Sequence, residues 1–317
     1  MFLSLFAVSA CIYDDRSECV LNIRFTYTYN VKDADAFSAE VKEIELYIFD
    51  EDGIFIRRLE DRSEGFPATF SIFTNSLTPG DYTFVALGRN RSVEDPSREF
   101  GFSDIIPGES VLSDFFMKLN TDAGVCNSEI AALYNGVMQV TLKPGPQSVT
   151  VPMMKLTNRF RIILMPYAGS GSLDAEDFDI CIEGNAGWLD YKGDKYADHP
   201  VEYRPYMQQS FLSGEVASPE VAGAAVADIN SSRILYDDRP MLVIRMSGDG
   251  RELLRLNLAW FLSLQGIDEH RQEWSNQEYL DRQDAYSIKL FVDQGLFIKS
   301  LIIVNGWEIT LNDVSLG

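Results

Sequence analysis

Residues 20–29 read VLNIRFTYTY, and this stretch decides the fold class. The odd-numbered positions are apolar or aromatic: Leu21, Ile23, Phe25, Tyr27 and Tyr29. The positions between them carry asparagine, arginine and threonine. Because alternate side chains of an extended chain point to opposite faces, the pattern predicts a β-strand with one buried face.

Short strand patterns recur along the rest of the chain. They cover residues 41–49, 54–56, 69–73, 82–87, 115–119, 137–142, 148–156, 159–165, 178–183, 234–235, 241–246, 252–258, 286–292, 297–304 and 307–311. Turn sequences such as Asp50-Glu51-Asp52-Gly53 and Pro144-Gly145-Pro146 separate them. Many short strands with turns between them and few helical patterns favour an all-β fold of antiparallel sandwiches.

Helical patterns are confined to the second half. Residues 275–284 form one, with Ser275 placed three residues before Glu278 as in a capping box, and residues 260–264 form another. At 317 residues the prior is two domains. We expect a boundary near Thr157-Asn158, with one sandwich over 20–157 and a second, containing a short helix, over 158–317.

The N-terminal residues resemble a lipoprotein signal. A short apolar run at residues 2–7 is followed by Val8-Ser9-Ala10-Cys11, which is the pattern that lipoprotein signal peptidase cleaves. This predicts a signal peptide over 1–10, lipid on Cys11 and a polar tether over 11–19. An apolar strand that ends in an ordinary cysteine is the alternative.

The composition excludes several classes of partner. The formal net charge is −21, and no basic run offsets it, so binding to nucleic acid is not expected. After the signal region no apolar run approaches the roughly 20 residues of a membrane-spanning helix.

Nothing in the sequence points to an enzyme or a cofactor. The two histidines, His199 and His270, are far apart, and no nucleophile elbow, phosphate loop or paired-histidine motif is present. We therefore expect no catalytic, cofactor or metal residues. An acidic cluster at residues 174–179 could hold a cation or form a solvated turn. Besides Cys11, the chain contains Cys19, Cys126 and Cys181, which leaves either a Cys19–Cys126 disulfide or buried free thiols open.

An ordered set of motifs over some 300 residues resembles the fimbrillin-A-associated anchor family, the anchoring subunits of bacterial type V pili. The segments that carry the resemblance are Asp14-Asp15, Ser17-Glu18-Cys19, Arg24-Phe25 with Tyr27 and Asn30, residues 34–37, residues 46–50 with Gly53, Pro79-Gly80-Asp81-Tyr82, Thr157-Asn158, residues 277–282 and Val304-Asn305-Gly306-Trp307. The resemblance implies two tandem transthyretin-like, Greek-key sandwiches and a lipid on the N-terminal cysteine.

The same resemblance implies a place at the base of a fimbrium on the outer face of the outer membrane. The protein would bind a fimbrillin-like stalk subunit, tether the fibre through its lipid and limit the length of the fibre. Asp14 and Asp15 would form the signal for export to the cell surface, although a solvated tether explains them equally well. The resemblance also implies that stalk subunits are opened by cleavage after an arginine near the N-terminus. The early arginines of this chain are Arg16 and Arg24, and Arg24 lies inside a predicted strand. A first domain that is not cut would stay closed.

The C-terminal strand is the candidate for contact with the partner. Trp307, Ile309 and Leu311 alternate with polar residues, so the strand has one apolar face. It can complete its own sheet or be donated to a stalk subunit by strand complementation.

The rival hypothesis is a surface lipoprotein that binds glycans or host ligands as an adhesin. An aromatic segment could stack on sugar rings: Trp188, Tyr191, Tyr196, Tyr203 and Tyr206. These side chains could equally pack a long loop onto the sandwich.

Overall fold

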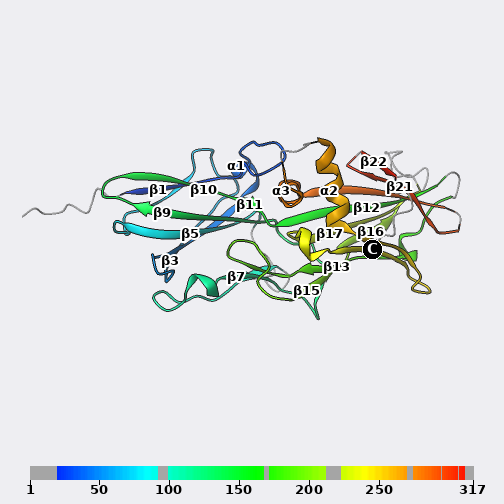
Figure 1. Ribbon diagram of the computed structural model, residues 1–317, viewed down its shortest axis with the longest axis horizontal. Coiled ribbons are helices and arrows are strands. Elements are labelled where there is room, and N and C mark those ends of the chain that lie inside the picture. Colours follow the sequence, from blue (N-terminus) through cyan, green and yellow to red (C-terminus); the bar gives the residue numbers. More distant parts are fainter. Residues whose placement is uncertain are drawn as a thin grey trace, which may run out of the picture.

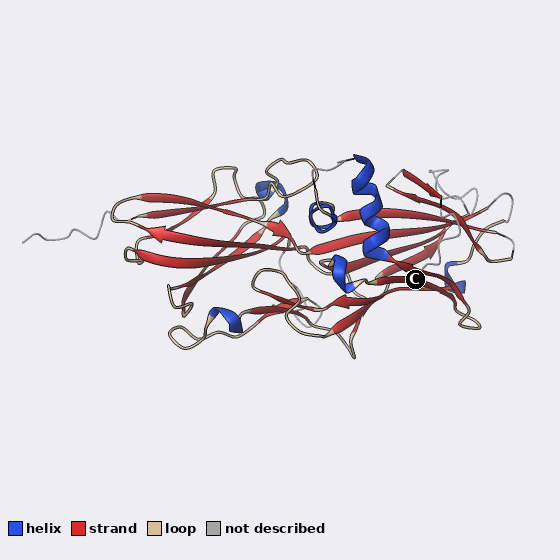
Figure 2. Cartoon of the chain, in the orientation of Figure 1, coloured by secondary structure: helices blue, strands red, loops and turns tan. Residues whose placement is uncertain are grey.

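The computed structural model describes residues 20–91, 99–167, 171–211, 223–269, 274–293, 295–305 and 307–310. Within these ranges the chain is mostly β-strand with few helices, which confirms the all-β prediction (Figure 2). The molecule is elongated, and many of its strands run close to its long axis (Figure 1).

The first half contains two facing sheets, which we call the first sandwich. The three-stranded sheet consists of β10 (Gln147–Pro152), β1 (Leu21–Thr26) and β4 (Ser71–Thr74), in that order. The five-stranded sheet consists of β11 (Met154–Lys155), β9 (Leu133–Leu142), β5 (Gly80–Arg89), β2 (Glu43–Phe49) and β3 (Phe55–Arg62). The short helix α1 (Phe37–Glu40) lies between β1 and β2 in sequence. The expected 20–29 strand is therefore the middle strand of its sheet.

The core of the first sandwich follows directly from the alternation in β1. Leu21, Ile23 and Phe25 are each at most 4% exposed, and they share one hydrophobic cluster with Ile44, Leu46, Ile48, Phe84 and Ala86 of the facing sheet. Arg24 points away from this cluster and is exposed. Because the buried side chains of β1 fill the space between the sheets, this strand is part of the core.

Strand β2 is buried on both of its faces. Ile44, Leu46 and Ile48 belong to the first core, whereas Tyr47 and Phe49 belong to the larger second core. The outer face of β2 is covered by the segment that contains Phe115 and Met117, with the rings of Tyr47 and Phe115 4.6 Å apart. A strand that is buried on both faces is largely apolar without alternation, which fits Leu46 to Phe49; the buried Glu45 is paired with Arg58 and Arg89.

Three sheets make up the rest of the structure. A six-stranded sheet has the order β16 (Met207–Ser210), β17 (Ala225–Ser232), β12 (Thr157–Pro166), β20 (Ala285–Val292), β21 (Ile298–Val304) and β22 (Trp307–Thr310). A five-stranded sheet has the order β19 (Glu252–Asn257), β18 (Met241–Met246), β13 (Phe178–Ala186), β15 (Pro200–Tyr203) and β8 (Val125–Cys126). The third sheet contains β14 (Trp188–Asp190), β7 (Phe116–Leu119) and β6 (Phe100–Phe102).

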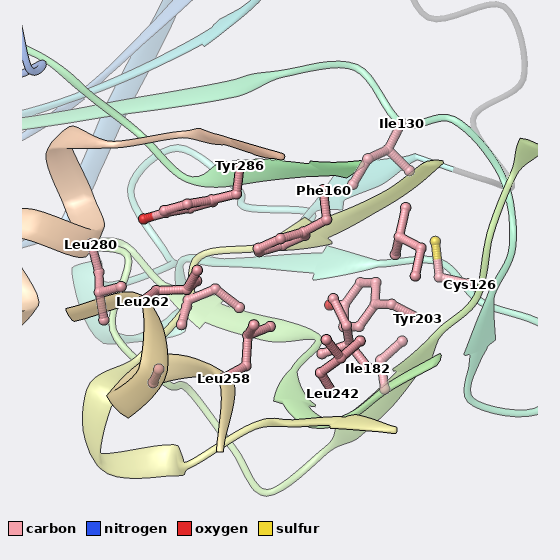
Figure 3. Close-up of a cluster of buried hydrophobic side chains, with 14 of the residues drawn as sticks. Cys126, Ile130, Phe160, Ile182, Tyr203, Leu242, Leu258, Leu262, Leu280 and Tyr286 are labelled. Atoms are coloured by element: carbon pink, nitrogen blue, oxygen red, sulfur yellow. The ribbon is translucent and has the colours of Figure 1, made fainter. Parts of the chain in front are cut away.

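Strands from the two halves of the chain pair with one another. Strand β7 pairs with β14, and β8 pairs with β15, so two of the sheets combine strands that precede residue 157 with strands that follow it. The second core is likewise shared: Cys126 and Ile130 lie in the same cluster as Phe160, Tyr203 and Leu242 (Figure 3). The division of the chain at residues 157 and 158 stays a prediction.

Several details of the strand prediction are wrong. The expected strand over 148–156 is two strands, β10 and β11, which lie in different sheets. Residues 234–235 are not a strand; the strand there is β17, all eight residues of which are buried between β16 and β12. Its sequence, AVADINSS, lacks alternation because both faces are covered. Three pairs, β1 with β10, β12 with β20 and β8 with β15, are parallel rather than antiparallel. The long connections between these strands permit the crossovers that parallel pairing requires.

The helices are close to where the sequence places them. The 260–264 pattern belongs to α2 (Leu258–Glu269), and the 275–284 pattern to α3 (Asn276–Arg282). Ser275 caps α3, since its Oγ accepts a hydrogen bond from the Glu278 backbone N–H at 3.1 Å. The Glu278 carboxylate binds Arg282 instead of completing the capping box. Short 3₁₀ helices occupy Leu112–Asp114, Ala175–Asp177 and Tyr236–Asp238.

Candidate functional site

The position of β1 between β10 and β4 is the first candidate site. It decides whether the first sandwich can accept a strand from another subunit. Strand β1 pairs over six residues with β10 on one side and over four residues with β4 on the other. Arg24 lies within both ladders, opposite Thr150 and Ser71. Its side chain is exposed, but its backbone is held on both sides, which protects the peptide bond that follows it.

The chain that leaves β1 is fastened to the second half by Arg282 of α3. The Arg282 guanidinium lies over the rings of Tyr29 (4.4 Å) and Trp274 (4.5 Å). It also pairs with Asp33 at 2.6 Å and Glu278 at 3.0 Å. We call this group the Arg282 clasp. A stacked, ion-paired arginine is a strong contact when it is partly buried, and the Arg282 side chain is 13% exposed.

A second arginine, Arg233, binds α3 through Asp281. Arg233 donates two hydrogen bonds to Asp281, from Nε at 2.7 Å and from Nη2 at 2.8 Å, and both residues are buried. It also binds the Gly193 carbonyl and Asp194. Burial lowers the pKa of Arg233, but its bonds to Asp281 and the charge of Asp194 raise it, and the net shift is upward. Helix α3 is therefore joined to the chain after β1 through Arg282, and to Arg233 through Asp281.

The C-terminal strand lies at the edge of the six-stranded sheet. The β22 backbone pairs antiparallel with β21, with Trp307 opposite Val304 and Ile309 opposite Ile302. The predicted partner residues Trp307 and Ile309 are thus on the last strand of the sheet as described, and β21 is its one neighbour among the described strands. Leu311 lies outside the described residues.

The predicted lipid and export residues, Cys11, Asp14 and Asp15, also lie outside the described residues, as does Cys19. None of the helices within the described ranges has the length and apolar character needed to cross a membrane. Cys126 and Cys181 are buried free thiols. Burial, followed by the nearby Glu183 carboxylate, raises the pKa of Cys181 to about 11.

The aromatic segment divides into a buried and a surface part. Tyr203 is fully buried, and its hydroxyl donates to the Ala186 carbonyl and contacts the Ser232 hydroxyl. Trp188 instead stacks on Phe116, with ring centroids 5.3 Å apart and planes 1° apart, and Tyr196 stacks on the same Phe116 at 4.6 Å. Tyr196 is 40% exposed, so this stack reaches the surface.

The acidic cluster forms local contacts rather than one centre. Asp174 caps the 3₁₀ helix at Ala175–Asp177, and Asp179 pairs with Arg204 at 2.6 Å. Across the described part of the chain, no three His, Cys, Asp or Glu side chains are grouped so that they could hold a metal ion. His199 packs against Trp188, with ring centroids 4.2 Å apart.

A polar cavity of about 430 Å³ lies where the first sandwich meets β12 and β17. Lys155 in its wall pairs with Glu40 at 3.1 Å and also with Asp284. The Tyr134 hydroxyl donates to Glu40 at 2.6 Å, and burial followed by the Glu40 charge raises the pKa of Tyr134. This cavity and both arginine contacts could not be predicted from the sequence, because their residues are far apart in the chain. The only signal was the 277–282 segment, quoted for its resemblance alone.

Comparisons with known proteins identify similar chains and folds. Residues 16–313 match the family model of fimbrillin-A associated anchor proteins Mfa1 and Mfa2. A search of curated proteins returned no match. A solved structure from Bacteroides thetaiotaomicron, for which polysaccharide binding has been suggested, has 29% identity and a TM-score of 0.81, over 93% of this chain and 99% of that one.

Two further solved structures are similar. One, also from Bacteroides thetaiotaomicron and suggested to be an adhesin, has 25% identity and a TM-score of 0.81, with 93% of this chain and 99% of that one covered. The fimbrial anchor protein Mfa2 from Porphyromonas gingivalis has 18% identity and a TM-score of 0.69, over 93% of this chain and all of that one. At 18% identity, the similarity to Mfa2 from Porphyromonas gingivalis shows a shared fold and no more.

Proposed function

Because the chain belongs to the family of fimbrillin-A associated anchor proteins, we propose that it is a lipid-anchored subunit at the base of a type V-like fimbrium. Lipid on Cys11 would hold it at the outer face of the outer membrane, with Asp14 and Asp15 as the export signal. It would bind a fimbrillin-like stalk subunit and end the fibre at the cell surface.

The position of β1 supports the role in ending the fibre. A subunit that accepts a strand from a neighbour needs an open groove in its sheet. Here the corresponding space in the first sandwich is filled by the protein's own β1, with Ile23 fully buried. The Arg282 clasp fastens the chain that follows β1. A first sandwich closed in this way offers no groove, so growth would stop at this subunit.

Anchoring is tested by Cys11→Ala expressed in the native cell. Labelled palmitate should enter the wild-type protein and be absent from the variant, because the sulfur that carries the lipid has been removed. Fibres should then be found in the medium. A Cys126→Ala variant is the control, since Cys126 is buried and should not carry lipid. Equal labelling of wild type and Cys11→Ala would contradict the proposal.

The contact with the stalk is tested on β22. If β22 is donated to a stalk subunit, replacing Trp307 and Ile309 by Asp should abolish co-purification of the stalk while the melting temperature of the isolated protein changes little. If β22 only completes its own sheet, the same variant should melt at a lower temperature. Normal melting together with normal co-purification would refute a role for this strand in either place.

A second candidate function is an adhesin that binds glycans. The stack of Phe116, Trp188 and Tyr196, which reaches the surface, is the observation that favours it. The suggested polysaccharide binding and adhesin roles of the two Bacteroides thetaiotaomicron proteins are consistent with it. Co-purification of the tagged protein with fibres from its own cell supports the anchor over a free-standing adhesin.

A further inference from the structure

The cavity beside β12 is built from both halves of the chain. Its wall consists of Ala39, Glu40, Lys42, Asn90, Arg91, Glu129, Ile130, Ala132, Tyr134, Lys155, Thr157, Arg159, Asn230 and Asp284. The volume of about 430 Å³ lies in the range of small-molecule sites. Only Ala39, Ile130 and Ala132 are apolar, so the cavity suits a polar ligand.

The charge in this cavity differs from that of the protein as a whole. The chain has 27 Lys and Arg against 48 Asp and Glu. The cavity wall has four basic side chains, from Lys42, Arg91, Lys155 and Arg159, against three acidic ones. The site therefore lacks the acidic excess of the rest of the protein, so it accepts an anionic group more readily than the surrounding surface does.

Two of these basic groups are already neutralised. Lys155 pairs with Glu40 and Asp284, and Arg91 pairs with Glu99 at 3.0 Å. Among the residues that the structure describes, no ion pair involves Arg159 or Lys42. Arg159 is exposed on β12 and can offer its planar group of donors to a carboxylate.

An acceptor in the wall lacks a donor. Asn230 on β17 is 4% exposed, and no described residue forms a hydrogen bond with its Oδ1. A buried acceptor without a partner is costly, and a hydroxyl group from a ligand would satisfy it. In the register of β12 with β17, Asn230 lies directly opposite Arg159. The free cation and the free acceptor are therefore neighbours.

We infer that this cavity binds a saccharide that carries a carboxylate, of the hexuronic acid type. Arg159 binds the carboxylate, and Asn230 accepts a hydrogen bond from a ring hydroxyl. This site is separate from the surface stack of Trp188 and Tyr196, and it does not depend on the anchoring role.

The wall disfavours two other anionic ligands. Glu129 and Asp284 would repel the double charge of a phosphate, whereas they can accept hydrogen bonds from sugar hydroxyls. The C-terminus of a peptide would bring side chains that need an apolar pocket, and the three apolar residues of this wall are too few to form one.

The experiment compares methyl β-D-glucuronide with methyl β-D-glucoside, which differ only at C6, where the glucoside has a hydroxymethyl group in place of the carboxylate. Binding to the full chain is measured by calorimetry and saturation-transfer NMR. We expect the glucuronide to bind about tenfold more tightly or better, since a charge-assisted bond to arginine is lost with the glucoside. Arg159→Ala should weaken glucuronide binding by about tenfold or more, and Asn230→Leu should weaken both sugars.

Arg24→Ala is the matched control, because Arg24 is an exposed strand arginine outside the cavity. It should leave binding unchanged, and melting curves of all variants verify that they are folded. The inference is overturned if the glucuronide does not bind, or if Arg159→Ala binds it as tightly as wild type. It is also overturned if inorganic phosphate or acetyl-Gly-Ala-Ala binds as tightly as the glucuronide.

Discussion

Replacing Phe25 by alanine is expected to lower the free energy of unfolding by about 3–5 kcal/mol. Phe25 is 4% exposed, and its ring stacks on Phe37 at 5.6 Å and on Phe70 at 6.2 Å. Removing the ring deletes these contacts and leaves a cavity between the two sheets. For a domain whose total stability is about 5–15 kcal/mol, this is a large fraction.

The control lies one residue away on the same strand. Arg24→Ala removes an exposed side chain that contributes nothing to the core, so its effect should stay within about 0.5 kcal/mol. Both variants can be compared by urea denaturation with fluorescence and circular dichroism. Equal loss of stability in the two variants would mean that the Phe25 side chain is not packed in the core between the two sheets.

The Phe25→Ala substitution should also make the peptide bond after Arg24 more accessible to proteolysis. In the wild type its backbone is held between β10 and β4, so trypsin should cut there slowly. Phe25→Ala lowers the free energy of local opening, and cleavage after Arg24 should become faster. This result would link the stability of β1 to the closed state on which the role in ending the fibre depends.

The sequence could predict β1 because one of its faces is buried and the other is exposed. Such a strand alternates, and the alternation of Ile23 and Phe25 with Asn22 and Arg24 is visible in the sequence alone. The capped start of α3 was predictable for a similar reason, since Ser275 and Glu278 lie only three residues apart.

Strand β17 could not be predicted in this way. It lies inside its sheet with both faces covered, and it includes buried Asp228 and Asn230. Asp228 is stabilised by a specific partner, because it accepts two hydrogen bonds from Arg161. Local sequence does not contain this information, because the partner is 67 residues away.

The contacts that join the two halves were hidden for the same reason. The pairing of β7 with β14, and of Arg282 with Asp33, connects residues that are far apart in sequence. The 277–282 segment gave the only indication. Most residues of this segment have a structural role. Side-chain hydrogen bonds are formed by Gln277, Glu278, Asp281 and Arg282. Leu280 lies in the second core.

Arg233→Met should destabilise the protein by about 3–5 kcal/mol, because it leaves a buried carboxylate without its charge partner. Asp281 is 6% exposed and loses both bonds from the guanidinium. Gln277 Nε2 remains as a donor at 2.9 Å, but an amide does not neutralise the charge. Methionine is unbranched and close to arginine in volume, so little packing volume is lost.

The double variant Arg233→Met with Asp281→Leu separates the cost of the orphaned charge from the value of the pair. Replacing both members of a buried ion pair by apolar residues is often nearly neutral, so much of the lost stability should return. Arg255→Ala is the surface control: Arg255 pairs with Glu183 and Glu252 with 37% of its side chain exposed, and its loss should cost no more than about 1 kcal/mol. If Arg233→Met proves as mild as Arg255→Ala, or if the double variant is less stable than Arg233→Met, then Asp281 is not the buried charge that Arg233 neutralises, and α3 is held by its apolar contacts alone.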